Sequence, residues 1–377
     1  MPKTSKIIIT VIILAAIAGI IYSYYKKSNP ANQILRPIRV GVLAPLTGGN
    51  AVLGERIRNG MELAKEDILK QDDTQPIEII YEDACLPKDA VSAMQKLVEI
   101  NKIDILGGSF CLIGLVPVLP IAEQNNIIVF NTAANPNSVL NKPFVFSTNI
   151  SIQNDAKQLA NYAAEKIKAQ TAAIVYLDTP FGQDYNKYLS QNFEQNGSKI
   201  LFSEKKAVDT TDFRTDLIKI KALNPDMIFV IHHGQSLGIF FKQTQQLGLR
   251  IPILGHYEAE DPTVIEYAGN AAVEGFVISS SEPKIKTDAV NKFMQIYLSK
   301  FAELPDVLAT NAYDALHLEI AAYKKCNGDF ECMKQHLRQV KDYPGVSGSI
   351  TINPDGSSDK PTIFKIVKDG QFVKLDD

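Results

Sequence analysis

The sequence predicts an α/β protein of two lobes, each a parallel sheet flanked by helices, with a hinge between them and a membrane helix at the N-terminus. Three observations favour this fold class. Short apolar strands alternate with helices, and this alternation runs twice without a long linker between the runs. The 377 residues, of which 45% are apolar, are also enough to bury two cores.

The N-terminal segment reads "MPKTSKIIITVIILAAIAGIIYSYYKK", with lysines on both sides of an apolar run at residues 7–25. The run is about 19 residues long, close to the roughly 20 that span a bilayer as a helix. Tyr22, Tyr24 and Tyr25 are typical of an interfacial aromatic belt. We therefore expect residues 1–35 to form a membrane anchor and spacer, with a cleaved signal peptide as the alternative. Either interpretation exports the rest of the chain, as a membrane-attached or as a periplasmic or secreted protein.

The first α/β unit follows the spacer and alternates strands with helices. Strands are expected at residues 36–48, 76–84, 103–110 and 127–136, and helices at 50–71, 86–102 and 112–126. An apolar stripe at helical spacing runs along the first of these helices and comprises Ile57, Met61, Leu63, Ala64 and Ile68.

The second unit repeats the pattern. Strands are expected at residues 171–179, 199–208, 226–234, 252–257 and 274–282, and helices at 151–170, 185–197, 213–225, 236–249, 287–301, 307–326 and 329–340. The tail from residue 348 reads as two β segments, with turns at Asp355-Gly356 and Asp369-Gly370. Because parallel strands covered by helices bind small ligands at their carboxyl ends, we expect a ligand cleft between the two lobes.

The four cysteines are Cys85, Cys111, Cys326 and Cys332, which form two local pairs. An even number in an exported chain suggests disulfides. Zinc and buried free thiols are the alternatives, although neither pair has the CxxC spacing of a zinc site. The formal net charge is −3 and the basic residues are scattered, so no nucleic-acid partner is indicated.

Several segments together carry a family resemblance: "IRVGVLAPLTGGNAVLGERIRNGMELAKEDI", "YEDACLPKDAV", "IDILGGSFC", "TAANP", "YLDTPFGQDY", "ATNAYDAL" and "VSGSITINPDGSSDKP". The chain from residue 36 to residue 375 resembles the type I periplasmic-binding-protein fold. It is most similar to the leucine/isoleucine/valine-binding-protein family, which are substrate-binding proteins of ABC transporters. The resemblance implies two Rossmann-like lobes joined by a hinge of three crossovers.

The expected first lobe comprises residues 36–149 plus 280–344, and the second lobe residues 150–279 plus 345–377. The crossovers are expected near Thr148–Ser151, Val277–Ser280 and Tyr343–Ser347. In many family members a disulfide joins the turn after the second strand to the end of the third strand, and these positions correspond to Cys85 and Cys111. Cys326 and Cys332 flank "NGDFE" and are expected to bridge a loop between two helices.

The resemblance also implies that the first lobe holds an α-amino acid head group at two turns, through backbone N–H groups and hydroxyls. The first turn corresponds to Cys111, Leu112 and Ile113, and the second to Thr132, Ala133 and Ala134. Leu112 stands where the family has a serine, and Ala134 where it has a threonine. The ligand is therefore expected to depend on backbone N–H groups, which bind anions at a helix N-terminus, and on Thr132.

In the second lobe, the resemblance implies an acid that receives the ligand ammonium, and Glu258 or Tyr257 falls at this position. A solvated surface acid is the alternative for Glu258. Phe181 falls where an aromatic side chain often covers the ligand. His233, of the adjacent pair His232-His233 at a strand end, lines the cleft or is buried there.

Leu53 and Leu308 fall at further wall positions of the family site, and ordinary core is the alternative for both and for Leu112. Apolar walls favour a ligand with an apolar portion. No enzyme is expected, because "GNAVLGER" lacks the Lys and Ser/Thr of a phosphate-binding loop and no GxSxG or HExxH motif is present.

Together these features predict an extracytoplasmic solute-binding receptor of an ABC importer, which binds an amino acid or a related small carboxylate or amide by hinge closure. Its expected partners are this ligand, an ABC transporter permease and the membrane, with no cofactor and no metal. The alternative is a membrane-tethered ligand sensor or scaffold, because Leu112 and Ala134 indicate an altered pocket.

Overall fold

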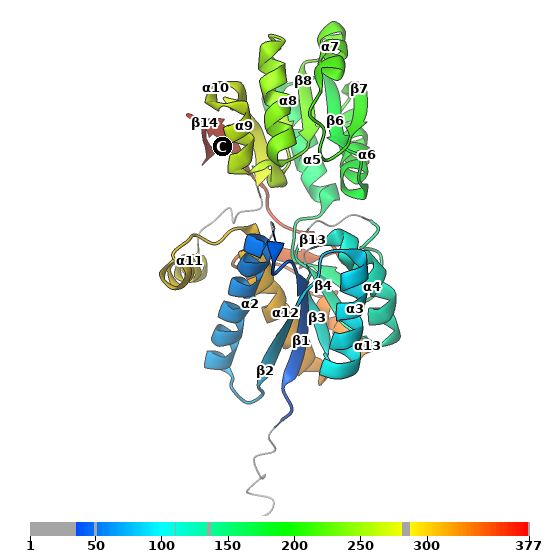
Figure 1. Ribbon diagram of the computed structural model, residues 1–377, viewed down its shortest axis with the longest axis vertical. Helices are drawn as coiled ribbons and strands as arrows, with labels where there is room; N and C mark the ends of the chain where they lie inside the picture. The colour runs from blue at the N-terminus through cyan, green and yellow to red at the C-terminus, as the bar shows by residue number, and fades with distance from the viewer. Residues whose placement is uncertain (1–34, 49–50, 110, 134–136, 281–286, 376–377) are drawn as a thin grey trace, which may run out of the picture.

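The computed structural model describes residues 35–48, 51–109, 111–133, 137–280 and 287–375. They form two α/β lobes, one above the other in Figure 1, and the predicted two-lobed α/β fold is confirmed. The apolar run of residues 7–25 lies outside the described residues. Among the helices that are described, none combines the length and the apolar character needed to cross a membrane.

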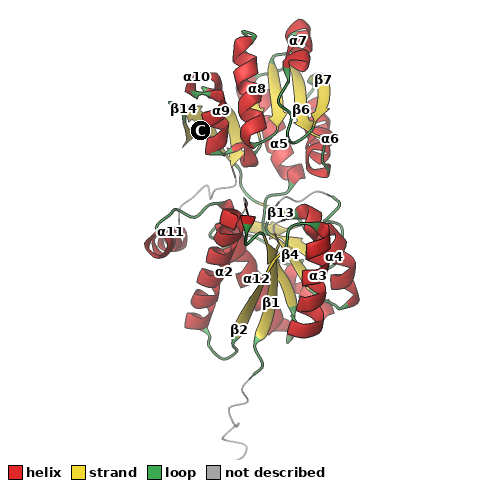
Figure 2. Cartoon of the chain, viewed as in Figure 1, coloured by secondary structure: helices red, strands yellow, loops and turns green. Residues whose placement is uncertain are grey.

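The first lobe is built on a five-stranded parallel sheet with the order β2-β1-β3-β4-β5. Its strands are β1 (Ile38–Ala44), β2 (Ile77–Asp83), β3 (Ile105–Ser109), β4 (Ile128–Asn131) and β5 (Val145–Ser147). Its helices are α2 (Ala51–Gln71), α3 (Pro87–Lys96, with a π-helical turn at Leu97–Asn101), α4 (Leu112–Gln124), α12 (Val307–Cys326) and α13 (Phe330–Leu337). Figure 2 shows α2, α3, α4 and α12 packed around the sheet.

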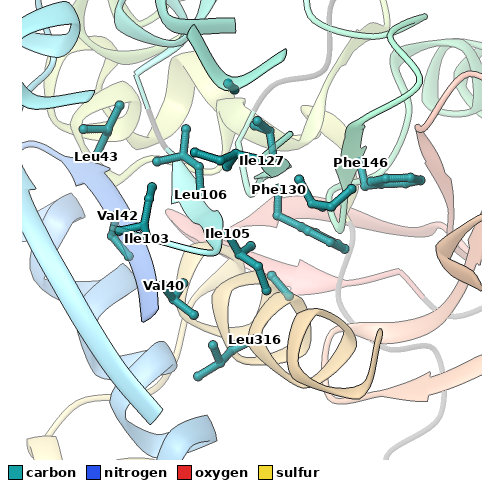
Figure 3. Packing of buried hydrophobic residues seen from close by; sticks show 14 of the residues in the cluster. Val40, Val42, Leu43, Ile103, Ile105, Leu106, Ile127, Phe130, Phe146 and Leu316 are labelled. Carbon is teal, nitrogen blue, oxygen red and sulfur yellow. The ribbon is translucent and has the colours of Figure 1, made fainter. Parts of the chain in front are cut away.

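The core of the first lobe lies between this sheet and its helices. Strands β3 and β4 are buried along their whole length, as expected for apolar runs covered on both faces. Val40, Ile105 and Phe130 belong to one buried cluster with Leu316 of α12 (Figure 3). The apolar stripe predicted along α2, from Ile57 to Ile68, is buried and is confirmed.

The second lobe has a seven-stranded sheet with the order β15-β14-β10-β9-β8-β6-β7. Its strands are β6 (Thr171–Leu177), β7 (Lys199–Lys206), β8 (Met227–Ile231), β9 (Ile253–Gly255), β10 (Val277–Ser280), β14 (Ile363–Lys368) and β15 (Gln371–Lys374). Its helices are α5 (Ile152–Tyr162, with a π-helical turn at Ala163–Ile167), α6 (Pro180–Gln195), α7 (Arg214–Leu223), α8 (Gly234–Gln246), α9 (Pro262–Ala268) and α10 (Asn270–Val273). The sheet is not wholly parallel, because β14 pairs antiparallel with both β10 and β15.

The segments that join the lobes differ in part from the expected crossovers. Residues 148–151 do run from β5 to α5, but Val277–Ser280 is strand β10, paired within the second sheet. The third segment contains a small antiparallel sheet of β11 (Tyr343–Gly345), β12 (Gly348–Ile352) and β13 (Ser358–Asp359). Ile350 and Ile352 are buried in the first lobe's core. The chain therefore enters the second lobe between β13 and β14, later than the expected boundary at residue 345.

Helix α11 (Asp288–Phe301) stands beside the first lobe in Figure 1. Phe293 and Tyr297 pack with Leu63 of α2 and Ala309 of α12 in a separate small cluster. The chain that returns from the second lobe is thus anchored on α2 before α12 completes the first lobe.

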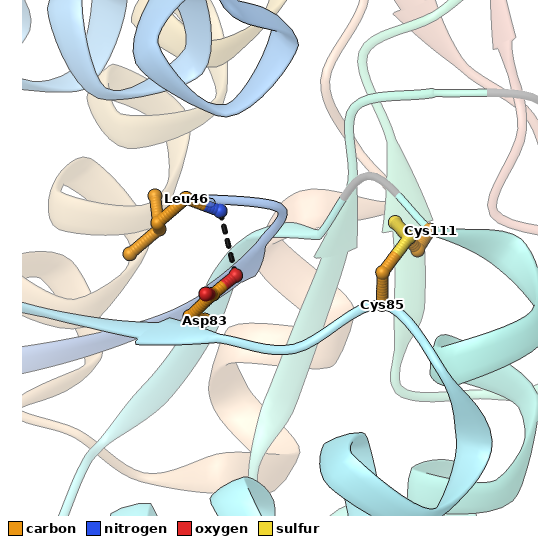
Figure 4. The surroundings of a disulfide bond; sticks show 4 residues. All are labelled: Leu46, Asp83, Cys85 and Cys111. Carbon is orange, nitrogen blue, oxygen red and sulfur yellow. Dashed lines mark hydrogen bonds between the residues drawn. A yellow bond between two sulfur atoms is a disulfide. The ribbon is translucent and has the colours of Figure 1, made fainter. Parts of the chain in front are cut away.

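Both disulfides are present and confirm the predicted pairs. Cys85 and Cys111 have Cα atoms 5.1 Å apart, and Cys326 and Cys332 have Cα atoms 5.6 Å apart. The first bridge joins the segment after β2 to the start of α4 (Figure 4). The second joins the end of α12 to α13.

Candidate functional site

The carboxyl ends of the parallel strands in both lobes point toward the junction of the lobes. β5 ends at Ser147 and the chain leaves the first lobe at once, while β10 ends at Ser280 and the next described helix, α11, packs on the first lobe. Since neighbouring parallel strands end at the same edge, the strand ends of both sheets meet at the junction (Figure 1). All the predicted turn segments follow these strand ends.

The first predicted turn is the N-terminus of α4. Cys111 is the N-cap residue and its sulfur is in the disulfide, so its side chain does not cap the leading N–H groups of the helix. Leu112 is half-buried against the first lobe's core, and Ile113 is 58% exposed. Gly114 allows this turn to approach Cys85 closely, because a Cβ at residue 114 would lie 2.6 Å from the Cys85 carbonyl oxygen.

The neighbouring turn after β1 is fixed by Asp83, at the end of β2. One carboxylate oxygen accepts a 2.7 Å hydrogen bond from the Leu46 N–H, as Figure 4 shows, and the other accepts from the Thr47 hydroxyl. These bonds lower the pKa of Asp83, with the Thr47 hydroxyl as the largest cause. The disulfide and Asp83 therefore brace the ends of three adjacent strands.

The second predicted turn follows β4. Thr132 is fully buried, and both its N–H and its hydroxyl donate to the Ser109 carbonyl oxygen, at 3.2 Å and 3.3 Å. The Ala133 N–H donates to the Asn131 side chain at 3.2 Å. The Thr132 hydroxyl, which we expected to bind ligand, is thus engaged within the first lobe. Ala134 lies outside the described residues.

Asn149, in the first crossover, was not predicted from the sequence as a site residue. Its side-chain Nδ2 donates to the Ala133 carbonyl oxygen and to the Tyr257 hydroxyl, both at 3.0 Å. One buried amide therefore brings together a predicted residue of each lobe. The sequence signal was weak, because Asn149 stands in the largely polar run "STNIS" between β5 and α5.

The second-lobe acid is half-buried. The Glu258 N–H donates to Nδ1 of His256 at 3.4 Å. Burial raises the pKa of Glu258 to about 7, and the nearby Asp155 carboxyl adds to the shift. Tyr257 is only 6% exposed, and burial raises the pKa of its hydroxyl. The structure therefore brings Glu258 and Tyr257 to the junction, where the Tyr257 hydroxyl accepts the hydrogen bond from Asn149.

Asp155 is a second carboxyl that the sequence did not single out. It is fully buried on α5, and its Oδ2 accepts from the Tyr185 hydroxyl at 2.6 Å and from the Ser279 hydroxyl at 2.9 Å. Its Oδ1 is buried and has no hydrogen-bond partner among the described residues. Burial raises the pKa of Asp155 to about 6.

Phe181 and the histidines form the apolar part of this region. Phe181 is 5% exposed and packs edge-on against Tyr185 and His256, with ring centroids 4.9 Å and 5.2 Å apart. His232 is buried, with Nε2 lying 3.2 Å from the Ala207 carbonyl oxygen, whereas His233 is half-buried and directly precedes α8. Burial lowers the pKa of His233, so its neutral form is favoured.

The predicted wall residues Leu53 and Leu308 both pack against the first lobe's core. Leu308 is 9% exposed at the start of α12, and Leu53 is half-buried at the start of α2. Their contacts match the ordinary-core alternative, and the half-buried Leu53 has more surface to offer a ligand.

Two further features lie at the junction. Asn137, in the loop between β4 and β5, donates to Asp184 of α6 from its N–H at 2.8 Å and from its side chain at 3.1 Å. Its side chain also contacts the Tyr188 hydroxyl at 3.1 Å, so this loop is tied to the second lobe. A polar pocket of about 380 Å³ lies at the crossovers and is lined by Ser151, Gln153, Asn154, Lys157, Asn353, Pro354, Asp355, Ser357 and Asp359.

Comparisons with known proteins agree with this architecture. Residues 37–371 match a protein family described as periplasmic binding proteins. A Leu/Ile/Val-binding protein from Escherichia coli (strain K12) is 24% identical over 309 residues, covering 77% of this chain and 83% of that protein.

Two solved structures share the fold. The branched-chain amino acid transporter substrate-binding protein of Streptococcus pneumoniae, in complex with isoleucine, is 20% identical. The superposition has a TM-score of 0.75 and spans 90% of the present chain and 100% of the S. pneumoniae chain. A solute-binding protein of an ABC transporter from R. palustris, in complex with benzoate, is 21% identical. It has a TM-score of 0.74 and covers 90% and 95% of the two chains.

Proposed function

Because the chain belongs to the periplasmic binding protein family, a family of solute-binding receptors and not of enzymes, we propose that it is the extracytoplasmic receptor of an ABC importer. The observation that carries this proposal is the meeting of both sets of strand ends at one junction, with the start of α4 on one side and Glu258 on the other. A ligand held from both sides stabilises the closed arrangement of the lobes and shifts the balance toward it.

We propose that the ligand is an amino acid or a related small carboxylate or amide. Three supports are independent of one another. The N–H groups at Leu112 and Ile113, which the Cys111 side chain does not cap, suit a carboxylate. Glu258, Tyr257 and Asn149 supply polar groups for an ammonium or amide. The related proteins are named for leucine, isoleucine and valine, or contain isoleucine or benzoate.

The remaining parts of the proposed site are apolar or neutral. Leu53, Leu112 and Phe181 supply apolar surface for the ligand's side chain, and His233 offers a neutral imidazole. The N–H groups of Thr132 and Ala133 and the Thr132 hydroxyl already donate within the first lobe, so the backbone N–H groups that bind the ligand are those that follow Cys111 at the start of α4. Hydrogen bonds from backbone N–H groups replace those of the missing hydroxyls, each of which contributes about 1 kcal/mol.

We also propose how the receptor is attached and divided. The apolar run of residues 7–25, with its lysine flanks, tethers the receptor to the membrane, where it meets its permease. The first lobe comprises residues 36–149 and the segment that includes α11, α12 and β11–β13, and the second lobe comprises residues 150–280 together with β14 and β15.

A ligand screen on the full chain in detergent tests the proposal. Thermal unfolding is measured with L-leucine, L-isoleucine, L-phenylalanine and benzoate. A ligand at 100 times its Kd adds about 2.7 kcal/mol to the free energy of unfolding, which gives a clear rise in melting temperature. If neither these probes nor a wider panel of small carboxylates and amides raised the melting temperature, the receptor proposal would fail and a scaffold that binds no small ligand would be favoured.

A further inference from the structure

Asn311, on α12, lies at the centre of a buried polar network that the proposed site does not include. Its side-chain Nδ2 donates to the Thr132 carbonyl oxygen at 3.3 Å, and its Oδ1 accepts from Lys360 Nζ at 2.6 Å. Its backbone carbonyl accepts from the Thr148 hydroxyl at 2.9 Å. One residue, itself 0% exposed, thus contacts the turn after β4, the first crossover and the segment after β13.

Lys360 is a buried lysine, 3% exposed, in the segment that carries the chain from β13 to β14. Its ammonium donates to Asn311 and to the Ser347 hydroxyl, and that hydroxyl donates to the Asp314 carboxylate. Asp314 also accepts from the Val346 and Ser347 N–H groups, at 2.9 Å and 2.8 Å. Burial lowers the pKa of Lys360 to about 7, although Asp314 opposes the shift.

Such an arrangement is costly unless every member is paired, because a buried charge or amide that loses its partner carries a penalty of several kcal/mol. The network is paired only while Lys360 stays beside α12. Lys360 lies three residues before β14, a strand of the second lobe, and Thr148 lies one residue after β5, a strand of the first lobe. Figure 1 shows β13 at the junction of the lobes, so both residues lie where rotation must bend the chain.

We propose that Asn311 and Lys360 are positioning residues that couple the Thr132 turn to the crossovers. Rotation of the second lobe displaces Lys360, Lys360 displaces the Asn311 side chain, and Asn311 displaces the Thr132 carbonyl. The turn that faces the ligand is then adjusted together with the angle between the lobes. The role of this coupling in ligand binding rests on the proposed function, but the coupling itself can be tested on the ligand-free chain.

Three variants divide the network. Asn311→Asp keeps the acceptor for Lys360 and removes the donor to Thr132, while Lys360→Met removes the ammonium and keeps the bond to Thr132. Thr148→Val preserves shape and removes only the bond to the Asn311 carbonyl, so it tests the same coupling with little effect on folding. Glu319→Gln is the matched control, because Glu319 is also buried on α12 but has no hydrogen-bond partner among the described residues.

The first readout is hydrogen exchange at the Thr132 and Ala133 amides of the ligand-free full chain in detergent. We expect Asn311→Asp and Lys360→Met to speed exchange there about tenfold or more, which corresponds to roughly 1.4 kcal/mol. Thr148→Val should give a smaller increase in the same direction, and Glu319→Gln none at these two amides. If the Lys360→Met and Thr148→Val variants exchanged both amides at the rate of the wild type, the proposed coupling would be overturned.

The second readout is the distance between spin labels on the two lobes, at Lys88→Cys of α3 and Lys219→Cys of α7, both exposed positions. We expect Lys360→Met and Thr148→Val to widen the ligand-free distance distribution, and Glu319→Gln to leave it unchanged. Unaltered distributions in both network variants would contradict the inference. The wild type could instead show no response to L-isoleucine while the variants still alter the amide exchange rates and the distance between the spin labels. That result would contradict the proposed ligand class and leave the coupling standing.

Discussion

The hydroxyl of Tyr185, on α6, donates a 2.6 Å hydrogen bond to the carboxylate of Asp155, on α5, and both side chains are fully buried. Ser279 of β10 donates to the same oxygen at 2.9 Å. Burial raises the pKa of Asp155 to about 6, and the hydrogen bonds from Tyr185 and Ser279 oppose this shift. The two donors therefore stabilise the ionised carboxylate at neutral pH.

Tyr185→Phe should therefore destabilise the protein in a pH-dependent way. The raised folded-state pKa means that stability already falls as pH rises from about 4 to about 6, and loss of a donor raises that pKa further. We expect a loss of about 1–3 kcal/mol near pH 8 and a smaller loss near pH 5. Urea unfolding at the two pH values measures this, with the exposed Tyr267→Phe as control. Equal losses at both pH values would show that Asp155 is not the relevant partner.

Glu258→Gln should weaken the binding of L-isoleucine about tenfold or more, since a hydrogen bond to a charged group contributes about 1.5–3 kcal/mol. Isothermal titration calorimetry gives the affinity. Glu266→Gln, an exposed acid on α9 of the same lobe, should bind as the wild type does. An unchanged affinity in Glu258→Gln would mean that this carboxylate does not receive the ligand ammonium.

The affinity for an amino acid should also rise with pH. Because the pKa of Glu258 is about 7, its ionised fraction grows about tenfold between pH 6 and pH 8. The affinity for L-isoleucine is expected to rise by a similar factor over this range. Benzoate has no ammonium and should show no such rise. A flat profile for L-isoleucine would argue against Glu258 as a titrating contact.

The two disulfides should differ in what their removal does. Replacing Cys85 and Cys111 by alanine opens a loop of 26 residues and should cost roughly 3–4 kcal/mol in the chain-entropy model. Replacing Cys326 and Cys332 opens a loop of 6 residues and should cost about 2 kcal/mol. Only the first pair adjoins the start of α4, so only its loss should also weaken ligand binding. Equal effects on affinity would contradict this distinction.

Glu319 should make the first lobe sensitive to alkaline pH. Its carboxyl packs against Gly107, where a Cβ would lie 2.6 Å from a Glu319 oxygen, and burial raises its pKa to about 8. Since the folded pKa lies above the ordinary value, stability falls as pH rises from about 4.5 to 8. Between pH 5 and pH 8 the wild type should lose about 2–4 kcal/mol more than Glu319→Gln. The exposed Glu194→Gln is the control for urea unfolding, and parallel profiles for all three proteins would refute the assignment.

The fold could be predicted because its strands and helices carry strong local patterns. Runs such as Ile38–Ala44 and Met227–Ile231 read as buried strands, and the resemblance to periplasmic binding proteins is confirmed by the family match. The short elements were missed. β5 has three residues and α9 seven, too few to show a period. The described part of the tail from residue 348 holds four short strands rather than two, because strands this short are set by pairing with a neighbouring strand rather than by a pattern in their own sequence.

The candidate site was predicted less completely, because burial of a polar residue depends on contacts distant in sequence. Asp155 stands in the first turn of a helix and Lys360 in a Pro- and Ser-rich segment, positions where charged residues are normally solvated. Asn149 joins the two lobes only because it hydrogen-bonds to both Ala133 and Tyr257, which are 124 positions apart in the sequence. Family resemblance proposed Tyr257 and Glu258 as site residues but did not point to Asn149 or His256, which hydrogen-bond to them in the structure.

The threading of the chain between the lobes sets the order in which an exported copy acquires its structure. The first lobe lacks α12, which packs on α2 and β3, until residue 326 has crossed the membrane. The second lobe lacks β14, which covers β10, until residue 368 has followed. The two cores differ in this respect: the first needs Leu316 and other residues of α12, whereas the buried residues of the second come from residues 152–278 with only Val367 added from β14. We therefore expect an exported chain to order its second lobe first and to complete its first lobe only when α12 follows.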